Sequence, residues 1–136
     1  MSNVGPTRKQ FEKFKNLPRD TPIMMLNLIK LNKRARYEDG RKATGEEAYA
    51  TYNEESSPIV ASVGGTIIWR GKPESVLIGP QDERWDLAFI SHFPNSKAFL
   101  DMVTEPAYQA IAFHRQAAVK DSRLIRMDET EACISF

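Results

Sequence analysis

The segment Ile23–Leu31 constrains the fold more than any other part of this sequence, because nearly all of its residues are apolar. Successive side chains of a strand point to opposite faces. One face therefore carries Met25, Asn27 and Ile29, while the other stays apolar until Lys30. We expect such a strand to be covered on both faces, so the sheet that contains it needs a layer on each side.

Three stretches show the apolar spacing of a helix, at residues 7–17, 46–63 and 96–118. The first opens with the Thr-x-x-Gln pattern of a capping box. The second, in which Pro58 is expected to introduce a bend, is followed by two glycines that permit a positive φ at the helix exit. The third follows an Asn-Ser cap and is divided by Pro106.

Clusters of β-branched and aromatic residues predict further strands at residues 66–70, 75–78, 86–93 and 123–127. Segment 75–78 follows a Gly-Lys-Pro turn, so we expect it to form a hairpin with segment 66–70. The C-terminal residues 132–136 could add a short strand, in which Cys133 is expected to be a small apolar filler rather than a reactive thiol.

The stretch Asn32–Gly45 is rich in charge and contains glycine, which predicts an exposed loop or a mobile flap. A basic cluster leads into it, formed by Lys30, Lys33, Arg34 and Arg36. This cluster could attract an anion, but a run of charge is usually a solvated surface.

With the first helix set aside, the predicted order is the split β-α-β arrangement of a ferredoxin-like α+β domain, with two helices on one face of an antiparallel sheet. We expect an N-terminal helical extension over residues 1–21, the domain over 22–128 and a C-terminal tail over 129–136. No segment is left to cover the other sheet face. A homodimer formed by sheet-to-sheet packing, known as a dimeric α/β barrel, is the expected solution.

The charge balance argues against several partners. Nineteen basic and 18 acidic residues give a formal net charge of +1, too small for a field that attracts nucleic acid or an anionic membrane. The longest apolar run, residues 22–29, is too short to cross a bilayer, and no apolar signal segment follows the N-terminus. The sequence therefore predicts a cytoplasmic protein with no nucleic-acid and no membrane partner.

From Tyr52 onward the chain carries short motifs in a particular order. They are Tyr52…Pro58-Ile59-Val60-Ala61…Gly64-Gly65, Trp69-Arg70-Gly71, Phe93-Pro94…Ala98-Phe99, Pro106-Ala107-Tyr108, His114-Arg115-Gln116-Ala117 and Asp121-Ser122-Arg123-Leu124. This series resembles the bacterial family called domain of unknown function (DUF) 1330, within the dimeric α/β-barrel superfamily. The resemblance extends over roughly Pro22 to Met127, and the chain departs from it at the N-terminal helix, the insertion 32–45 and the tail.

The resemblance implies a dimeric ferredoxin-like fold and a ligand cavity, without choosing a reaction. Relatives in the superfamily include cofactor-independent monooxygenases, haem-handling enzymes and muconolactone isomerases. The sequence has no Gly-x-Gly-x-x-Gly, Walker, Gly-x-Ser-x-Gly or Cys-x-x-Cys motif and only two histidines. We therefore predict no cofactor and no metal site.

His114 and Arg115 are the candidate catalytic pair. An imidazole that titrates near neutral pH beside a permanent cation could bind or deprotonate an acidic small molecule. The alternative is structural: His114 would pack on its helix and bond to a backbone carbonyl, and Arg115 would pair with Asp121.

A second set of residues could form the walls and polar contacts of a ligand site: Asn27, Tyr49, Tyr52, Trp69, His92 and Tyr108. Small-ligand sites are usually apolar and aromatic with a few polar groups. The aromatic members could equally be core or dimer contacts. Asn27 interrupts an apolar strand, so its amide must find a partner in the protein or in a ligand.

Two functions remain open. The first is a small-molecule-binding dimer that acts as a cofactor-independent enzyme on an acidic or enolisable organic substrate, held between sheet and helices. The alternative is a non-catalytic binding or assembly module whose apolar sheet face serves only dimerisation.

Overall fold

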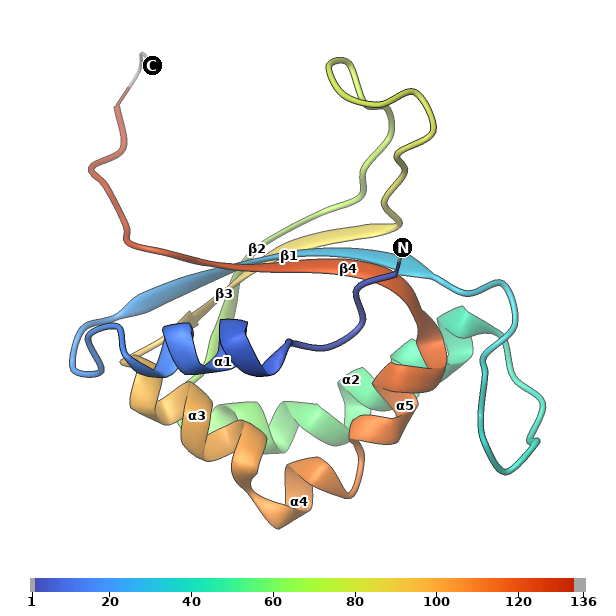
Figure 1. The fold of residues 1–136 in the computed structure, drawn as a ribbon, viewed down its shortest axis with the longest axis horizontal. Coiled ribbons are helices and arrows are strands. Elements are labelled where there is room, and N and C mark those ends of the chain that lie inside the picture. Colours follow the sequence, from blue (N-terminus) through green and yellow to red (C-terminus); the bar gives the residue numbers. More distant parts are fainter. Residues whose placement is uncertain (1, 134–136) are drawn as a thin grey trace.

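The structure is a computed structural model that describes residues 2–133, and it confirms the α+β, ferredoxin-like fold (Figure 1). The antiparallel sheet has the order β2-β3-β1-β4, with β1 (Ile23–Leu31), β2 (Thr66–Gly71), β3 (Leu87–Phe93) and β4 (Val119–Met127). The helices are α1 (Arg8–Lys15), α2 (Gly45–Ser62), α3 (Ser96–Thr104), α4 (Pro106–Gln109) and α5 (Ala112–Ala118). Figure 1 shows these helices together on one side of the sheet.

Strand β1 lies between β3 and β4 and shows the alternating burial that its sequence predicts. Ile23, Met25 and Ile29 are each at most 2% exposed and belong to the two core clusters beneath the helices. The intervening residues are only half-buried, because no helix of the described chain covers their face of the sheet. On this helix-free face Trp69 and Ile125 are 53% and 46% exposed.

Helices α1 and α2 both begin where a side chain caps the backbone. The Gln10 amide donates to the Thr7 hydroxyl at 3.1 Å, which confirms the first capping box. A second capping box precedes α2, where the Glu47 amide donates to the Thr44 hydroxyl at 3.0 Å. Helix α2 continues through Pro58 and is followed by Gly64, whose φ of 81° supplies the predicted exit.

The third predicted helix is interrupted more often than its sequence indicates. Pro106 stands at the first position of α4, as expected, but α4 ends at Gln109 and α5 starts only at Ala112. The prediction that Pro106 alone divides the helical stretch 96–118 is therefore wrong. Strand β4 follows α5 directly at Val119, earlier than the predicted start at residue 123.

The predicted hairpin between segments 66–70 and 75–78 is wrong. Strand β2 pairs instead with β3, in a register that runs from Thr66 opposite His92 to Gly71 opposite Ala88. Residues 72–86 form a loop that rises from the sheet on the side away from the helices (Figure 1). Leu77 and Ile78 in this loop are 93% and 92% exposed, because no neighbouring strand reaches them within the described chain.

The segment 32–45 is anchored to the rest of the protein at its base, unlike a mobile flap. Asn32 is buried: its amide donates to the Ala118 carbonyl at 2.8 Å and its side chain to the Ala117 carbonyl at 3.1 Å. Arg34 and Thr44 form an isolated bridge that closes the base of the loop, while most residues between them are exposed. Only the tip of the loop therefore fits the prediction.

The expected C-terminal strand, residues 132–136, lies largely outside the described residues. Its described part contains no strand, and Cys133 is exposed. The prediction that Cys133 is a buried apolar filler is therefore wrong.

Candidate functional site

A cavity of about 1460 Å³ lies between the helix-covered face of the sheet and the helices. Its floor comes from the sheet, with Asn27, Phe89 and Ser91 among the lining residues, and its roof from α2 and α4. The N-terminal strap, which we define as residues 3–18, lines one side. The cavity is partly open to solvent, so a small molecule could enter it without unfolding of an element.

The strand register brings the floor residues together. Arg70 on β2 lies opposite Phe89 on β3, which lies opposite Asn27 on β1. In antiparallel strands, residues directly opposite each other project from the same face. This row crosses the sheet beneath the helices and therefore places a cation, a ring and an amide side by side on the cavity floor.

Three tyrosines form the polar part of the roof. Tyr49 and Tyr52 stand one turn apart on α2, with ring centroids 5.5 Å apart, and the Tyr52 hydroxyl shares a hydrogen bond of 2.8 Å with that of Tyr108. Burial raises the pKa of Tyr49 to about 12, and burial followed by the neighbouring Tyr108 raises that of Tyr52 further. The Tyr49 and Tyr52 hydroxyls therefore stay protonated near neutral pH, as hydrogen-bonding groups rather than bases.

Asn27 was expected to find a partner for its amide either in the protein or in a ligand, and the structure shows a partner in the protein. It is 9% exposed, lines the cavity and donates from its side-chain nitrogen to the Met25 carbonyl at 3.0 Å. This local bond fixes the amide on the floor. The side-chain oxygen is an acceptor that a ligand donor could meet.

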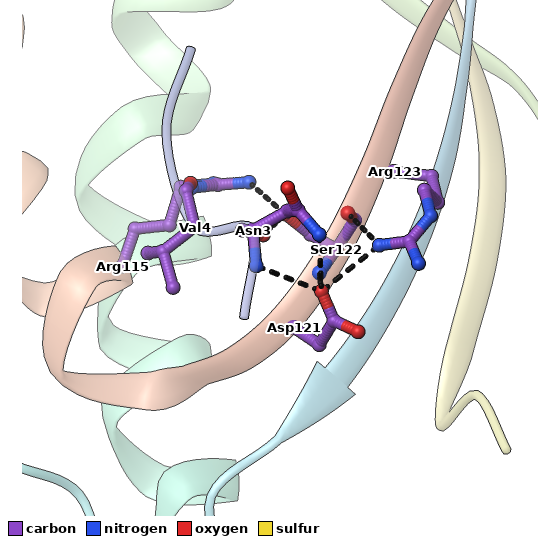
Figure 2. Close-up of polar contacts among 6 residues, drawn as sticks. All are labelled: Asn3, Val4, Arg115, Asp121, Ser122 and Arg123. Atoms are coloured by element: carbon purple, nitrogen blue, oxygen red, sulfur yellow. Dashed lines mark hydrogen bonds and ion pairs between the residues drawn. The ribbon is translucent and has the colours of Figure 1, made fainter. Parts of the chain in front are cut away.

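Arg115 holds the strap against the body of the protein (Figure 2). Its guanidinium donates to the Val4 carbonyl and, at 3.4 Å, to the Ser122 hydroxyl. The predicted alternative of an Arg115–Asp121 pair is wrong, because Asp121 pairs with Arg123 at 2.9 Å. Arg115 bonds only to neutral acceptors, so its full charge remains beside the cavity that it lines.

The rest of the strap docks through α1 and the residues after it. The Phe14 ring lies 5.4 Å from that of Phe99 on α3, and the Arg126 guanidinium donates to the Pro18 carbonyl at 2.6 Å. The Ser96 hydroxyl donates to the same carbonyl at 3.3 Å. The N-terminal extension is thus a wall of the cavity.

Asp121 anchors the beginning of the strap and gives it a pH dependence. Burial alone would raise the pKa of Asp121, but hydrogen bonds from the Asn3 amide, the Arg123 side chain and the Ser122 amide together lower it. A carboxylate with a depressed folded-state pKa contributes stability above its unfolded-state pKa and loses it as the pH falls through the folded-state pKa.

We therefore expect Asp121→Asn to lower the free energy of unfolding at pH 7 and to have progressively less effect below a pH of about 4. Urea unfolding of the wild type and the variant between pH 2.5 and 7 measures the difference. Asp128→Asn, on the exposed chain after β4, is the control. A difference that stays constant down to the lowest pH would contradict this role of Asp121.

The family model named "Domain of unknown function (DUF1330)" matches residues 40–128. The chain belongs to the DUF1330 family. Crystal structures of the RPA0582 protein of unknown function from Rhodopseudomonas palustris are similar to it. One is 45% identical, with a TM-score of 0.93, and the match covers 97% of this chain and 100% of that one. The methylated RPA0582 protein is 47% identical over 96% of both chains, also with a TM-score of 0.93.

More distant structures share only the fold with this DUF1330 protein. SnoaB, a cofactor-independent oxygenase from Streptomyces nogalater, has 11% identity and a TM-score of 0.54, covering 85% of this chain and 99% of that one. A dimeric protein of unknown function from Bacteroides fragilis has 17% identity and a TM-score of 0.50, covering 79% and 96%. The curated proteins contain no match.

The DUF1330 match begins at residue 40, so Asn27 and the whole strap lie outside it. The R. palustris matches span nearly the entire chain, strap included. Part of the cavity wall therefore comes from segments that the family model does not cover.

The structure brings together Asn27, Tyr49, Tyr52, Tyr108 and Arg115, which all line the cavity. Three other candidates lie elsewhere. Trp69 and His92 project from the helix-free face, because their register partners Ile90 and Met24 belong to it. His114 is buried under the 32–44 loop, where Nδ1 shares a hydrogen bond of 2.7 Å with the Tyr37 hydroxyl.

The surroundings of His114 differ from both sequence interpretations. Its Nε2 lies 3.1 Å from a Glu55 carboxylate oxygen, so both ring nitrogens meet side chains rather than a backbone carbonyl. The Phe113 ring lies 4.0 Å from the imidazole. The histidine thus links α2, α5 and the loop 32–44.

Sequence reasoning did not single out Arg70, Phe89, Ser91 or the strap as parts of the site. The period-two alternation of β3 places Phe89 and Ser91 on one face, but only the register with β1 shows that this face is that of Asn27. Within residues 2–133 no cluster of three or more His, Cys, Asp or Glu could hold a metal ion. No helix in this part of the chain is long and apolar enough to cross a membrane.

Proposed function

We propose that this DUF1330 protein binds a small organic molecule in the cavity beneath the helices and acts, without a cofactor, on an acidic or enolisable substrate. The observation that carries the proposal is the make-up of the cavity, in which apolar and aromatic side chains alternate with hydroxyl, amide and cationic groups that could orient a ligand. Sites for small molecules are usually built in this way. The fold shared with SnoaB, described as a cofactor-independent oxygenase, is compatible with this chemistry.

In this proposal Asn27 and Arg115 orient the substrate, while Tyr49, Tyr52 and Tyr108 donate hydrogen bonds to its oxygen atoms. An enolate or carboxylate oxygen is stabilised by fixed donors in a site that excludes most water. His114 is a positioning residue, because its ring nitrogens are engaged by Tyr37 and Glu55 and it does not line the cavity.

We also propose that two copies pair through the helix-free face of the sheet. The exposed apolar side chains of Trp69 and Ile125 support this arrangement, since a large apolar surface in water favours association. The structurally similar B. fragilis protein is described as dimeric. If the cavity takes no ligand, assembly through this face is the alternative function.

A ligand screen on the full chain tests the binding proposal. We expect at least one small carboxylic acid, β-keto acid or phenol to raise the melting temperature, since a ligand at 100 times its Kd adds about 2.7 kcal/mol to stability. Asn27→Leu, similar in size but apolar, should lose the shift. Gln109→Leu, on the exposed surface of α4, should keep it. No shift with any compound would overturn the proposal.

A further inference from the structure

The lining of the cavity is strongly biased in charge. It contains Lys13, Arg70, Arg115, Arg123 and Arg126, and no aspartate or glutamate is among the described lining residues. The whole chain has 19 basic and 18 acidic residues, so this bias does not follow from composition. A cleft lined by one sign of charge, with poorly polarisable walls, concentrates ligands of the opposite sign.

Among these five cations only Arg123 has a charged partner in the described part of the chain. Arg123 pairs with Asp121, and Arg126 donates to the Pro18 carbonyl and lies over the Phe14 ring, 5.2 Å from its centroid. No hydrogen bond or ion pair joins Arg70 to another described residue, Arg115 meets only neutral acceptors, and the buried Nη1 of Arg126 has no hydrogen-bond partner. Arg70 and Arg115 are therefore available to an anion.

Arg70 and Arg115 approach the same part of the cavity from opposite sides. Arg70 comes from the floor, in the row of Phe89 and Asn27, and Arg115 comes from α5. Both charges act on the Tyr49 hydroxyl and lower its pKa against the larger effect of burial. The three groups all line the cavity, and both cations lie within electrostatic range of the Tyr49 hydroxyl.

Another part of the cavity lining is apolar. Phe93 and Phe99 lie with ring centroids 5.3 Å apart, Phe14 completes the cluster from α1, and Met102 packs in the same core beneath α3. All of them line the cavity. A molecule that contacts both parts of the lining therefore needs a charged group at one end and an apolar or aromatic body at the other.

We propose that the ligand is an organic carboxylate whose carboxylate group sits between Arg70 and Arg115 and whose apolar body extends toward Phe93, Phe99 and Met102. This inference rests on the proposed function and adds the charge and the orientation of the ligand. The guanidinium group presents paired N–H donors that match a carboxylate, and such charge-assisted bonds are stronger than those between neutral groups. In this proposal Arg70 is the residue that makes the site prefer a negatively charged ligand over a neutral one of the same shape.

Calorimetric titration of the full chain with naphthalene-2-carboxylate and naphthalene-2-carboxamide tests the charge. We expect the carboxylate to bind at least about 10-fold more tightly, because the amide cannot form charge-assisted bonds. Arg70→Gln should reduce this preference by weakening the binding of the carboxylate alone, and the part contributed by Arg115 should remain. Arg8→Gln, an exposed cation on α1 outside the cavity, should leave both affinities unchanged.

Phe99→Leu tests the orientation, and it should weaken both probes by a similar factor because both share the naphthalene body. Equal affinity of the two probes for the wild type, or the same loss with Arg8→Gln as with Arg70→Gln, would overturn the carboxylate inference and leave the binding proposal standing. Absence of binding by both probes would overturn the inference as well. The proposed function itself fails only if the wider ligand screen is also negative.

Discussion

Replacement of Gly45 by alanine is expected to destabilise the protein by about 3 kcal/mol or more, an effect at the upper end of overpacking substitutions. Gly45 is buried at the first position of α2. A Cβ atom built there would lie 1.8 Å from the Asn32 carbonyl oxygen. That carbonyl cannot retreat easily, because Asn32 is held to the Ala117 and Ala118 carbonyls by its side chain and its amide.

Chemical denaturation of the Gly45→Ala protein measures this loss. Gly5→Ala is the matched control, since a Cβ at Gly5 has no atom within 4 Å, and it should change the free energy of unfolding little. An equal, small effect of the two substitutions would show that the 32–44 loop can move away from the new Cβ atom at little cost. The loop would then be the mobile flap that its composition predicts, and not an anchored segment.

Local chemistry made much of the fold predictable from the sequence. The capping box at Thr7, the asparagine cap before α3 and the glycine after α2 all act within a few residues, so the sequence shows them directly. The alternation of Ile23–Leu31 likewise needs no partner to be recognised.

Strand pairing was harder to predict, because it depends on contacts between distant segments. Residues Val76, Leu77 and Ile78 have the composition of a strand, yet they lie in an exposed loop. The true partner of β2 is β3, which begins only after that loop. Aliphatic composition alone cannot distinguish a short strand from a surface that another molecule could cover.

The candidate site was predictable from the sequence where a polar residue interrupts an apolar segment. Asn27 stood out as an amide in an apolar strand, and it lies on the cavity floor. The direction in which His114 points was harder to predict, because the sequence indicated an unbroken helix after Pro106. The break between Gln109 and Ala112 changes the direction in which α5 presents its residues, so Arg115 lines the cavity and His114 does not.

Substitution of Leu26 by aspartate is expected to abolish self-association while leaving the cavity side of the sheet intact. Leu26 lies at the centre of the helix-free face, opposite Ile90 on β3 and Ile125 on β4. In a sheet-to-sheet dimer these residues would be fully covered. A carboxylate placed there would lose its water without gaining a partner, which costs several kcal/mol for each copy.

Light scattering on a size-exclusion column at about 10 to 50 µM, which exceeds the Kd of a dimer that associates with about −8 kcal/mol, should give a dimer for the wild type and a monomer for Leu26→Asp. Ala50→Asp introduces the same charge on the exposed side of α2 and should remain dimeric. A monomeric wild type would overturn the proposed pairing, and a dimeric Leu26→Asp variant would show that the interface lies on another surface.

Ligand affinity adds a second readout, because the cavity and the helix-free face lie on opposite sides of the sheet. A Leu26→Asp monomer that still binds carboxylates would show that each copy carries a complete site, whereas loss of binding together with pairing would show that the site depends on the second copy.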